Sequence, residues 1–459
     1  MFKTLANAWK IKDLRSKFLF TLMIVLLYRI GTSVPVPFVN STALSFSSQT
    51  IFGFFNTLSG GAFEQGSLFA LGVQPYITAS IVVQLLTVAI PALERLSKLG
   101  EEGKRKINII TRYITIGISL ITAIGYFLML KNGDALALFA SKNYSVFSAF
   151  VIVACYVAGS CLVMWLAEKI NDKGIGNGIS IILFANIISR GAPLLMNFIS
   201  MFQTEYYGPL YLMYGWVMNG NGHVAGSTIF TILVLAGLLA MIWFVIFISD
   251  SERRIPVQYA KRVVGRKMYG GQNSNIPLKV NMAGVMPIIF ANAIITLPSM
   301  IAMFVKPTTG SFWAKVVSFC SQTSWFFALM QFILILAFAY FYVAISFNPT
   351  EVAGNIQKQG GAIPGIRPGK ATSSFIQKVL SKVTFIGALS LSVISVVPLV
   401  IQLILNSLQD VNVAFYAFSA VSELANVGTS IVIVVGVIIE TVREIEAQMT
   451  MRHYKGFLG

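Results

Sequence analysis

The chain has 459 residues, of which 56% are hydrophobic and only 11% are charged, and its mean hydropathy is +0.76. Soluble proteins carry about 25% charged residues, so this composition excludes a globule that faces water on all sides. Several apolar blocks approach the roughly 20 residues that cross the hydrocarbon core of a bilayer. The sequence therefore predicts a multi-pass, all-α membrane protein, because a β-barrel would show short alternating strands instead.

Ten membrane-spanning helices are predicted along the chain, and an even number places both termini on the same side. Their ranges are 18–37, 72–92, 112–131, 146–168, 176–197, 228–249, 284–305, 325–347, 375–404 and 414–441. The first is expected to be retained, because no small-residue cleavage site of a signal peptide follows it.

The net charge of +17 is typical of proteins that bind nucleic acid, anionic lipid or an acidic partner. In the ten-span arrangement most of the 34 basic residues fall at the termini and in the loops on one side. The positive-inside rule makes that side cytoplasmic. Both termini are therefore expected in the cytoplasm.

The residues and motifs of an enzyme are missing from the sequence. It contains no phosphate-binding Walker loop, no HExxH zinc motif and no nucleophile elbow. Cys155, Cys161 and Cys320 are spaced neither as a metal site nor as a disulfide framework. We expect no catalytic residues, no bound metal and no cofactor.

The segment Phe52–Leu71 differs from the spans because it is apolar yet rich in glycine and polar residues. Irregular backbone at membrane depth is tolerated only inside protein or beside a watery cavity. The segment is therefore expected either to lie outside the membrane or to fold back into the protein as a short re-entrant helix.

Two pairs of similar stretches indicate an internal repeat. Gly72-Val-Gln-Pro75-Tyr-Ile77 opens the second span, and Gly284-Val-Met-Pro287-Ile-Ile289 opens the seventh. Asn177–Leu183 in the fifth span similarly matches Val427–Ile433 in the tenth. This pairing predicts two five-helix halves, and since five is odd, the halves have inverted topology.

Aliphatic residues occupy related positions beside these motifs. If their helix faces converge, they form an uncharged collar that excludes water and ions by dewetting; the alternative is ordinary core packing. The residues are Val73, Ile77, Ile179, Leu183, Ile289 and Ile433.

Two long basic loops, 250–283 and 348–377, are expected on the cytoplasmic side. Their charge either serves only the orientation rule or binds an acidic partner or the phosphates of RNA. The alternation of apolar and basic residues in Ile255–Met268 favours a projecting hairpin or short helix. Arg367 stands in the turn-rich Pro364-Gly-Ile-Arg-Pro-Gly369, which would hold its guanidinium in a fixed place.

Several stretches, in the right order over essentially the whole chain, resemble the SecY family, the large subunits of the bacterial protein-conducting channel. They include ALGVQPYITASIVVQLL, EKINDKGIGNGISIILFANI, ERRIPVQYAKR, PLKVNMAGVMPIIFA, FNPTEVAGNIQKQGGAIPGIRPG and MRHYKGFLG. The resemblance implies a channel that passes unfolded secretory polypeptides and releases apolar segments sideways into lipid through a lateral gate between spans 2–3 and 7–8. It also implies residence in the bacterial cell (inner) membrane.

The resemblance implies roles for three groups of residues. The collar becomes the pore ring. The re-entrant segment, about Phe54–Ser67, becomes a plug with Phe54, Phe55, Asn56, Ser59, Gly60, Gly61, Phe63 and Ser67. The basic loops become docking sites for the ATPase SecA or the ribosome, with Arg253, Arg254, Lys261, Arg262, Arg266, Lys267, Arg367 and Lys370.

The implied partners are the subunits SecE and SecG, SecA, the ribosome, polypeptides that carry signal sequences, and anionic lipids. The expected organisation is an N-terminal half at 1–200, an outer hinge loop at 201–227 and a C-terminal half at 228–459. Two alternatives remain at this point: a secondary transporter with inverted repeats, and a membrane scaffold or insertase that docks ribosomes.

Overall fold

The computed structural model describes residues 9–40, 55–56, 58–132, 135–136, 145–189, 191, 223–259, 262–264, 267–269, 273–302, 304, 312–321, 324–407 and 415–455. Most of the outer loop predicted at 201–227, as far as residue 222, lies outside these residues.

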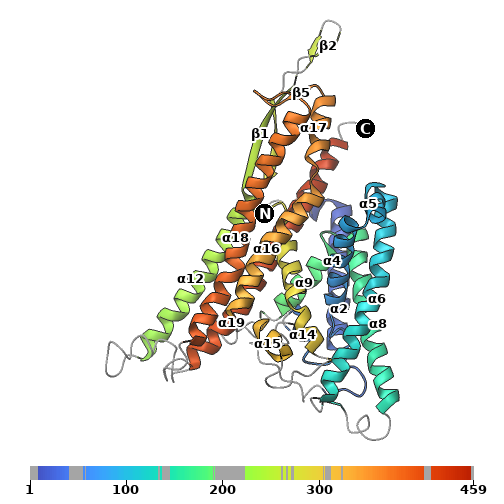
Figure 1. Ribbon diagram of the computed structural model, residues 1–459, viewed down its shortest axis with the longest axis vertical. Coiled ribbons are helices and arrows are strands. Elements are labelled where there is room, and N and C mark those ends of the chain that lie inside the picture. The colour runs from blue at the N-terminus through green and yellow to red at the C-terminus, as the bar shows by residue number, and fades with distance from the viewer. Residues whose placement is uncertain are drawn as a thin grey trace.

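Helices dominate the described chain (Figure 1). Those of the first half are α2 (Lys12–Ser33), α4 (Gln74–Ala89), α5 (Pro91–Lys98), α6 (Glu101–Asn132), α8 (Ser145–Lys173) and α9 (Gly178–Ser189). Those of the second half are α12 (His223–Asp250), α13 (Met286–Ile295), α14 (Leu297–Ala302), α15 (Phe312–Phe319), α16 (Trp325–Ser346), α17 (Pro349–Lys358), α18 (Lys370–Ser407) and α19 (Phe415–Lys455). Helical residues coincide with each of the ten predicted ranges.

Prolines explain two interruptions within those ranges. The second range bends by 106° between α4 and α5 at Ile90, the residue before Pro91. The seventh range breaks at Thr296, between α13 and α14, two residues before Pro298. The residue before a proline is disfavoured in the α region, which explains the bend at Ile90. Pro298 acts differently: it has no N–H to bond the Ile294 carbonyl, and its ring crowds that carbonyl.

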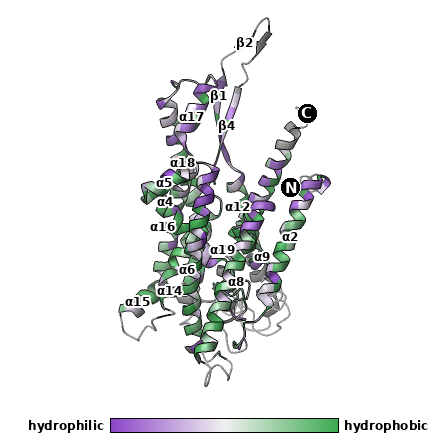
Figure 2. Cartoon of the chain, turned by 90° about the vertical axis from the view of Figure 1, so that its right-hand side faces the viewer, coloured by the Kyte–Doolittle hydropathy of each residue, from purple (hydrophilic) through white to green (hydrophobic). Residues whose placement is uncertain are grey.

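Four helices of the described chain, namely α6, α8, α16 and α18, are long and apolar enough to cross a membrane, or five if the bent α4–α5 pair counts as one span. Figure 2 shows hydrophobic residues along the bundle and hydrophilic ones around α17, β1 and β4 at one end. The fold is thus a mostly helical bundle with a polar cap.

The two halves lie side by side and contact one another through several pairs of helices. Helix α4 packs against α13, α14 packs against α6, and α9 packs against α19. In Figure 1, α9, α13 and α14 lie between the blue-to-green helices of the first half and the long helices of the second. The largest hydrophobic cluster lies there and includes residues of both halves.

The polar cap contains a small antiparallel sheet. Strands β4 (Asn273–Lys279), β1 (Glu252–Tyr259) and β5 (Gly361–Ala362) pair in the order β4-β1-β5, with Ile255 opposite Ile276. Strands β2 (Arg262–Val264) and β3 (Lys267–Tyr269) form a second antiparallel pair beyond it. Of the two structures that the alternation in Ile255–Met268 favoured, the loop adopts the hairpin.

Candidate functional site

The two glycine-proline motifs adopt the same local structure. Gly72 and Gly284 have positive φ angles of 53° and 62°, in the region that favours glycine. The valine that follows each caps its helix, at φ −88° and ψ −7° for Val73 and φ −89° and ψ −9° for Val285. Each helix then begins with a proline in its first turn, where the missing N–H costs nothing.

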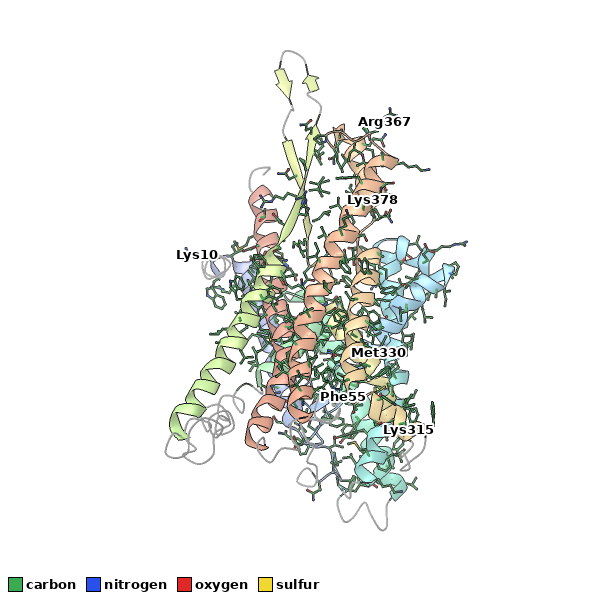
Figure 3. All side chains as sticks on the ribbon, turned by 60° about the vertical axis from the view of Figure 1, so that its left-hand side comes forward. Lys10, Phe55, Lys315, Met330, Arg367 and Lys378 are labelled. Atoms are coloured by element: carbon green, nitrogen blue, oxygen red, sulfur yellow. The ribbon has the colours of Figure 1, made fainter. Side chains whose placement is uncertain are left out.

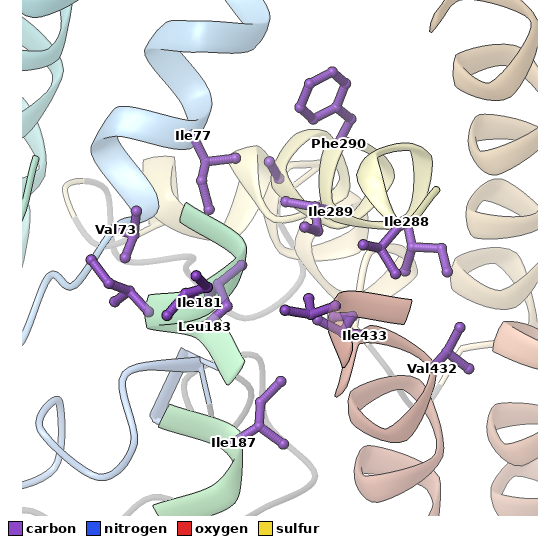
Figure 4. Packing of buried hydrophobic residues seen from close by; sticks show 14 of the residues in the cluster. Val73, Ile77, Ile181, Leu183, Ile187, Ile288, Ile289, Phe290, Val432 and Ile433 are labelled. Carbon is purple, nitrogen blue, oxygen red and sulfur yellow. The ribbon is translucent and has the colours of Figure 1, made fainter. Parts of the chain in front are cut away.

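Five of the six predicted collar residues are buried in one cluster that spans both halves. Val73 and Ile77 come from the start of α4, Leu183 from α9, Ile289 from α13 and Ile433 from α19, and each is 2–5% exposed. Ile179, the sixth, is partly buried and packs against this cluster. Figure 4 shows the labelled side chains converging from these four helices.

The chemistry of this collar is entirely aliphatic. Its side chains carry no hydrogen-bonding group and no charge, so they offer nothing that coordinates an ion or a polar solute. They fill space by dispersion contacts alone, and these do not depend on the identity of the neighbouring side chain. The arrangement suits a barrier that closes on itself.

The segment Phe52–Leu71, for which a re-entrant fold is one expectation, lies next to the collar in its described part. Phe55, Asn56, Ser59, Phe63 and Ser67 are each buried to within 8% exposure. Residues 59–73 are mostly turns, with helical residues at 55, 56 and 58, while Phe54 lies outside the described residues. A cavity of about 30 Å³ is lined by Phe55 and Phe63 of the segment together with Val73 and Leu183 of the collar.

The turns of this segment depend on glycine and on internal side-chain hydrogen bonds, among them a staple between Asn56 and Glu64. Gly60 and Gly61 have φ angles of 67° and 91°. Asn56 Nδ2 donates to Glu64 Oε2 at 2.5 Å, and its Oδ1 accepts from the backbone N–H of Glu64 at 3.1 Å. The staple ties the two ends of the turn together and pairs polar groups that the segment would otherwise bury unpaired.

Sequence reasoning missed the side chains that hold this segment from outside. Tyr126 of α6 donates its hydroxyl to the carbonyl of Phe63, and Tyr156 of α8 donates to the carbonyl of Gly66. Asn186 of α9 donates to the carbonyl of Leu58. The only signal in the sequence was a polar side chain within an apolar stretch, and such a signal does not indicate which group the side chain bonds.

Two of the charged residues that lie within predicted spans have defined surroundings. Glu168 of α8 pairs with Arg112 of α6, with a closest distance of 2.7 Å between Oε2 and Nη2. In contrast, Arg29 Nη1 in α2 is buried and has no hydrogen-bond partner among the residues that the structure describes. It lies at the edge of an apolar groove.

That groove has a volume of about 610 Å³ and runs between α2, α9 and α19. Phe18, Leu22, Ile188 and Ile445 are among the aliphatic and aromatic residues that line it, with Arg29 and Ser189 toward one end. An open apolar groove on a membrane protein is suited to an apolar helix or to lipid chains.

The two basic loops form one folded unit at the polar cap. Ile255 and Val257, on one face of β1, pack with Ile356 of α17, Ile363 and Ile376 of α18. The tyrosine hydroxyl of Tyr259 also donates to Gln359 Oε1 at 3.5 Å. We name this unit, residues 252–279 and 349–376, the platform.

The platform presents basic side chains on its surface. Arg253, Arg254, Arg367 and Lys370 are exposed. Arg262 lies in β2 and Lys267 in β3, while Lys261 and Arg266 lie outside the described residues. Figure 3 shows Arg367 and Lys378 toward one end of the molecule and Lys315 at the other.

Turns hold Arg367 in place. Gly365 and Gly369 have positive φ angles of 79° and 97°, and the Thr372 hydroxyl donates to the Arg367 carbonyl at 2.9 Å. Among the described residues, no three His, Cys, Asp or Glu side chains gather as a metal site would require.

The chain is similar to known proteins along its whole length. A model of the SecY family matches residues 67–442. The protein translocase subunit SecY of Streptomyces coelicolor is 41% identical over 475 residues, and that of Halalkalibacterium halodurans is 40% identical over 463, each with complete coverage of both chains.

Solved structures share the fold. One described as a protein conducting channel has a TM-score of 0.60 at 18% identity and covers 95% of this chain and 92% of its own. The Sec61 structure of a canine ribosome-channel complex from the endoplasmic reticulum has a TM-score of 0.56 at 16% identity, with the same coverage.

Proposed function

The chain belongs to the SecY family, and from that membership we propose that it is the non-catalytic pore subunit of a protein-conducting channel. It passes unfolded secretory polypeptides across the bacterial cell membrane and releases apolar segments sideways into lipid. The ten helical ranges and the sorted charge support a ten-span topology with both termini in the cytoplasm. The matched turns at Gly72 and Gly284 support two inverted halves.

The collar is the observation that carries this proposal. Residues Val73, Ile77, Ile179, Leu183, Ile289 and Ile433 form the pore ring, with contributions from both halves. A ring of this kind grips any side chain without specific bonds, which suits a passing polypeptide of arbitrary sequence. It holds back ions because an uncharged constriction dewets.

The re-entrant segment acts as the plug, and the seam where α4 and α6 meet α13 and α14 acts as the lateral gate. An apolar signal sequence prefers lipid to a watery pore by roughly 25 cal/mol per Å² of apolar surface. That preference drives the segment through the seam once the two halves separate.

The platform is the docking surface for the partner that supplies the work, either the ATPase SecA or the ribosome. Its exposed arginines bind acidic side chains or RNA phosphates, and Arg367 is the fixed contact among them. The chain needs such a partner because its sequence contains no nucleotide-binding motif.

The remaining partners bind within or beside the membrane. The apolar groove between α2, α9 and α19 fits one helix of SecE, which would brace the two halves at the seam opposite the gate. SecG binds at the periphery. Anionic lipids bind the basic residues at the cytoplasmic helix ends, each such contact contributing about 1 kcal/mol.

The alternative transporter requires a polar or charged site near the middle of the membrane. The cluster shared by the two halves is aliphatic and aromatic instead. A scaffold that only docks ribosomes would have no use for a collar to which both halves contribute.

Reconstitution tests the proposal. The chain is assembled with its partner subunits in proteoliposomes and supplied with SecA, ATP and a secretory precursor. We expect the precursor to become protected from external protease only when its signal sequence is intact. ATP-independent uptake of a small solute, with no protection of the precursor, would overturn the proposal in favour of a transporter.

A further inference from the structure

The plug segment is held in place by hydrogen bonds to its main chain. The hydroxyl of Tyr126 lies 2.5 Å from the Phe63 carbonyl oxygen, and that of Tyr156 lies 3.2 Å from the carbonyl oxygen of Gly66. Asn186 Nδ2 lies 2.7 Å from the carbonyl oxygen of Leu58. Because the acceptors are backbone atoms, substitutions of plug side chains leave them in place.

All three donors are fully buried, and all belong to the N-terminal half. Tyr126, Tyr156 and Asn186 are each 0% exposed. The two tyrosine rings pack edge to face, with centroids 5.0 Å apart, and Tyr126 packs on Phe63 at 4.6 Å. The Phe63 carbonyl also accepts from the Gly66 N–H at 3.4 Å, and the Gly66 carbonyl from the Val36 N–H at 3.2 Å. Each tyrosine therefore adds one further buried hydrogen bond that favours the seated position.

The plug also keeps its own shape independently of these donors. The staple between Asn56 and Glu64 and the backbone bond from Gly61 N–H to Asn56 oxygen at 2.8 Å lie within the segment. The internal bonds therefore survive if the segment leaves its place. The three side-chain bonds from outside would break, together with the backbone bond from the Val36 N–H to the Gly66 oxygen at 3.2 Å.

Asn186 links the plug to the pore ring. It follows Leu183 by three residues on α9, so the two lie on the same helix face. Its amide also donates to the Tyr28 hydroxyl of α2 at 2.9 Å. A movement of α9 that widens the ring at Leu183 also pulls Asn186 away from the carbonyl of Leu58.

We propose that Tyr126, Tyr156 and Asn186 are positioning residues that latch the plug main chain to the N-terminal half and set how readily it leaves the pore. The inference rests on the proposed channel function. The latch adds a threshold: a signal sequence that widens the ring must break the Asn186 bond and thereby loosens the plug.

Removal of single hydroxyl groups tests the latch. Tyr126→Phe and Tyr156→Phe keep the aromatic packing and delete one donor each. One net hydrogen bond corresponds to about a fivefold change in an equilibrium. We expect the resting open probability in planar bilayers to rise about fivefold in each variant. The pair should show a further rise, but not the product of the two, because the two rings are in contact and their effects are not independent.

The second readout is one that a purely structural role would not change. Precursors with a weakened signal sequence should be translocated better by the double variant than by the unchanged channel, while the rate with an intact precursor stays the same. Tyr113→Phe is the matched control, because Tyr113 lies on α6 and is 72% exposed. It should behave as the unchanged chain.

Two outcomes separate this inference from the proposed function. If the double variant translocates intact precursor yet matches Tyr113→Phe in resting open probability and signal dependence, the latch is rejected and the channel stands. If the unchanged chain does not translocate any precursor, the proposed channel function itself is rejected. A lower yield of assembled complex, without higher open probability in the recovered channels, also rejects the latch.

Discussion

The proposed pore ring and the platform both contain a buried cluster of aliphatic residues, but the two clusters are proposed to serve different purposes. At the proposed ring, Ile77, Leu183, Ile289 and Ile433 would themselves be the working surface, and their lack of charge would be the property that matters. In the platform, Ile255 and Val257 lie beneath a charged face and only support it. Burial alone therefore does not distinguish a functional apolar cluster from a structural one. The two are distinguished by their surroundings: the ring lies where two halves of the molecule meet, and the platform cluster lies beneath a charged surface.

The largest expected effect is an increase in ion leak, which we expect from substitutions in the ring and not from substitutions in the platform. Ile77→Asn combined with Ile289→Asn places polar amides in the ring, which then wets. We expect the ion conductance of the resting reconstituted complex to rise roughly tenfold or more. The control is Ile77→Val with Ile289→Val, which keeps the ring apolar. An unchanged conductance in the Asn pair would show that the ring does not hold back ions.

The next effect is confined to the platform. Arg367→Glu reverses the charge on the rigid turn, and we expect SecA-driven translocation to fall about tenfold or more because a like charge meets the acidic partner. Resting conductance should stay the same. Lys378→Glu, on α18 away from the turn, controls for net charge; equal losses in the two variants would show that no specific contact is made at Arg367.

A third substitution tests the support beneath the charged face. Ile255→Ala removes a buried side chain from β1, and loss of a buried isoleucine costs about 2–5 kcal/mol. We expect faster hydrogen exchange in β1 and β4 and weaker SecA binding, again without ion leak. Gln258→Ala, at an exposed position of β1, should leave both unchanged. If hydrogen exchange in Ile255→Ala is as slow as in the unchanged chain, the buried cluster does not support the charged face.

The smallest effect concerns an ion pair on the platform surface. Arg254 Nε lies 2.6 Å from Glu252 Oε1, but its side chain is 68% exposed. Exposed pairs contribute no more than about 1 kcal/mol. Glu252→Gln should therefore change the free energy of hydrogen exchange in β1 by no more than that amount. A larger change would show that the platform depends on surface charge as well as on its buried face.

Much of this arrangement follows from local sequence. The ten helical ranges are visible as apolar blocks, and the turns at Gly72 and Gly284 follow from the paired glycine-proline motifs. Pro91 and Pro298 contained the signal for the bend after α4 and the break after α13, although the predicted ranges ran through both.

The contacts that sequence reasoning missed join residues far apart in the chain. Tyr156 and Gly66 are 90 positions apart, and Asn186 and Leu58 are 128 apart. The sequence around a buried tyrosine does not indicate which group accepts its hydrogen bond. The packing of β1 on α17 and α18 was missed for the same reason, since the alternation in β1 marked a buried face without identifying what covers it.

One crosslinking measurement tests most directly that polypeptides pass through the ring. Cys155, Cys161 and Cys320 are first replaced by serine, and Ile77→Cys, Ile433→Cys or the exposed Val393→Cys of α18 is introduced singly. A secretory chain stalled halfway and carrying a thiol-reactive probe should crosslink at positions 77 and 433 and not at 393. Crosslinking at 393 alone, or equally at all three, would contradict passage through the ring.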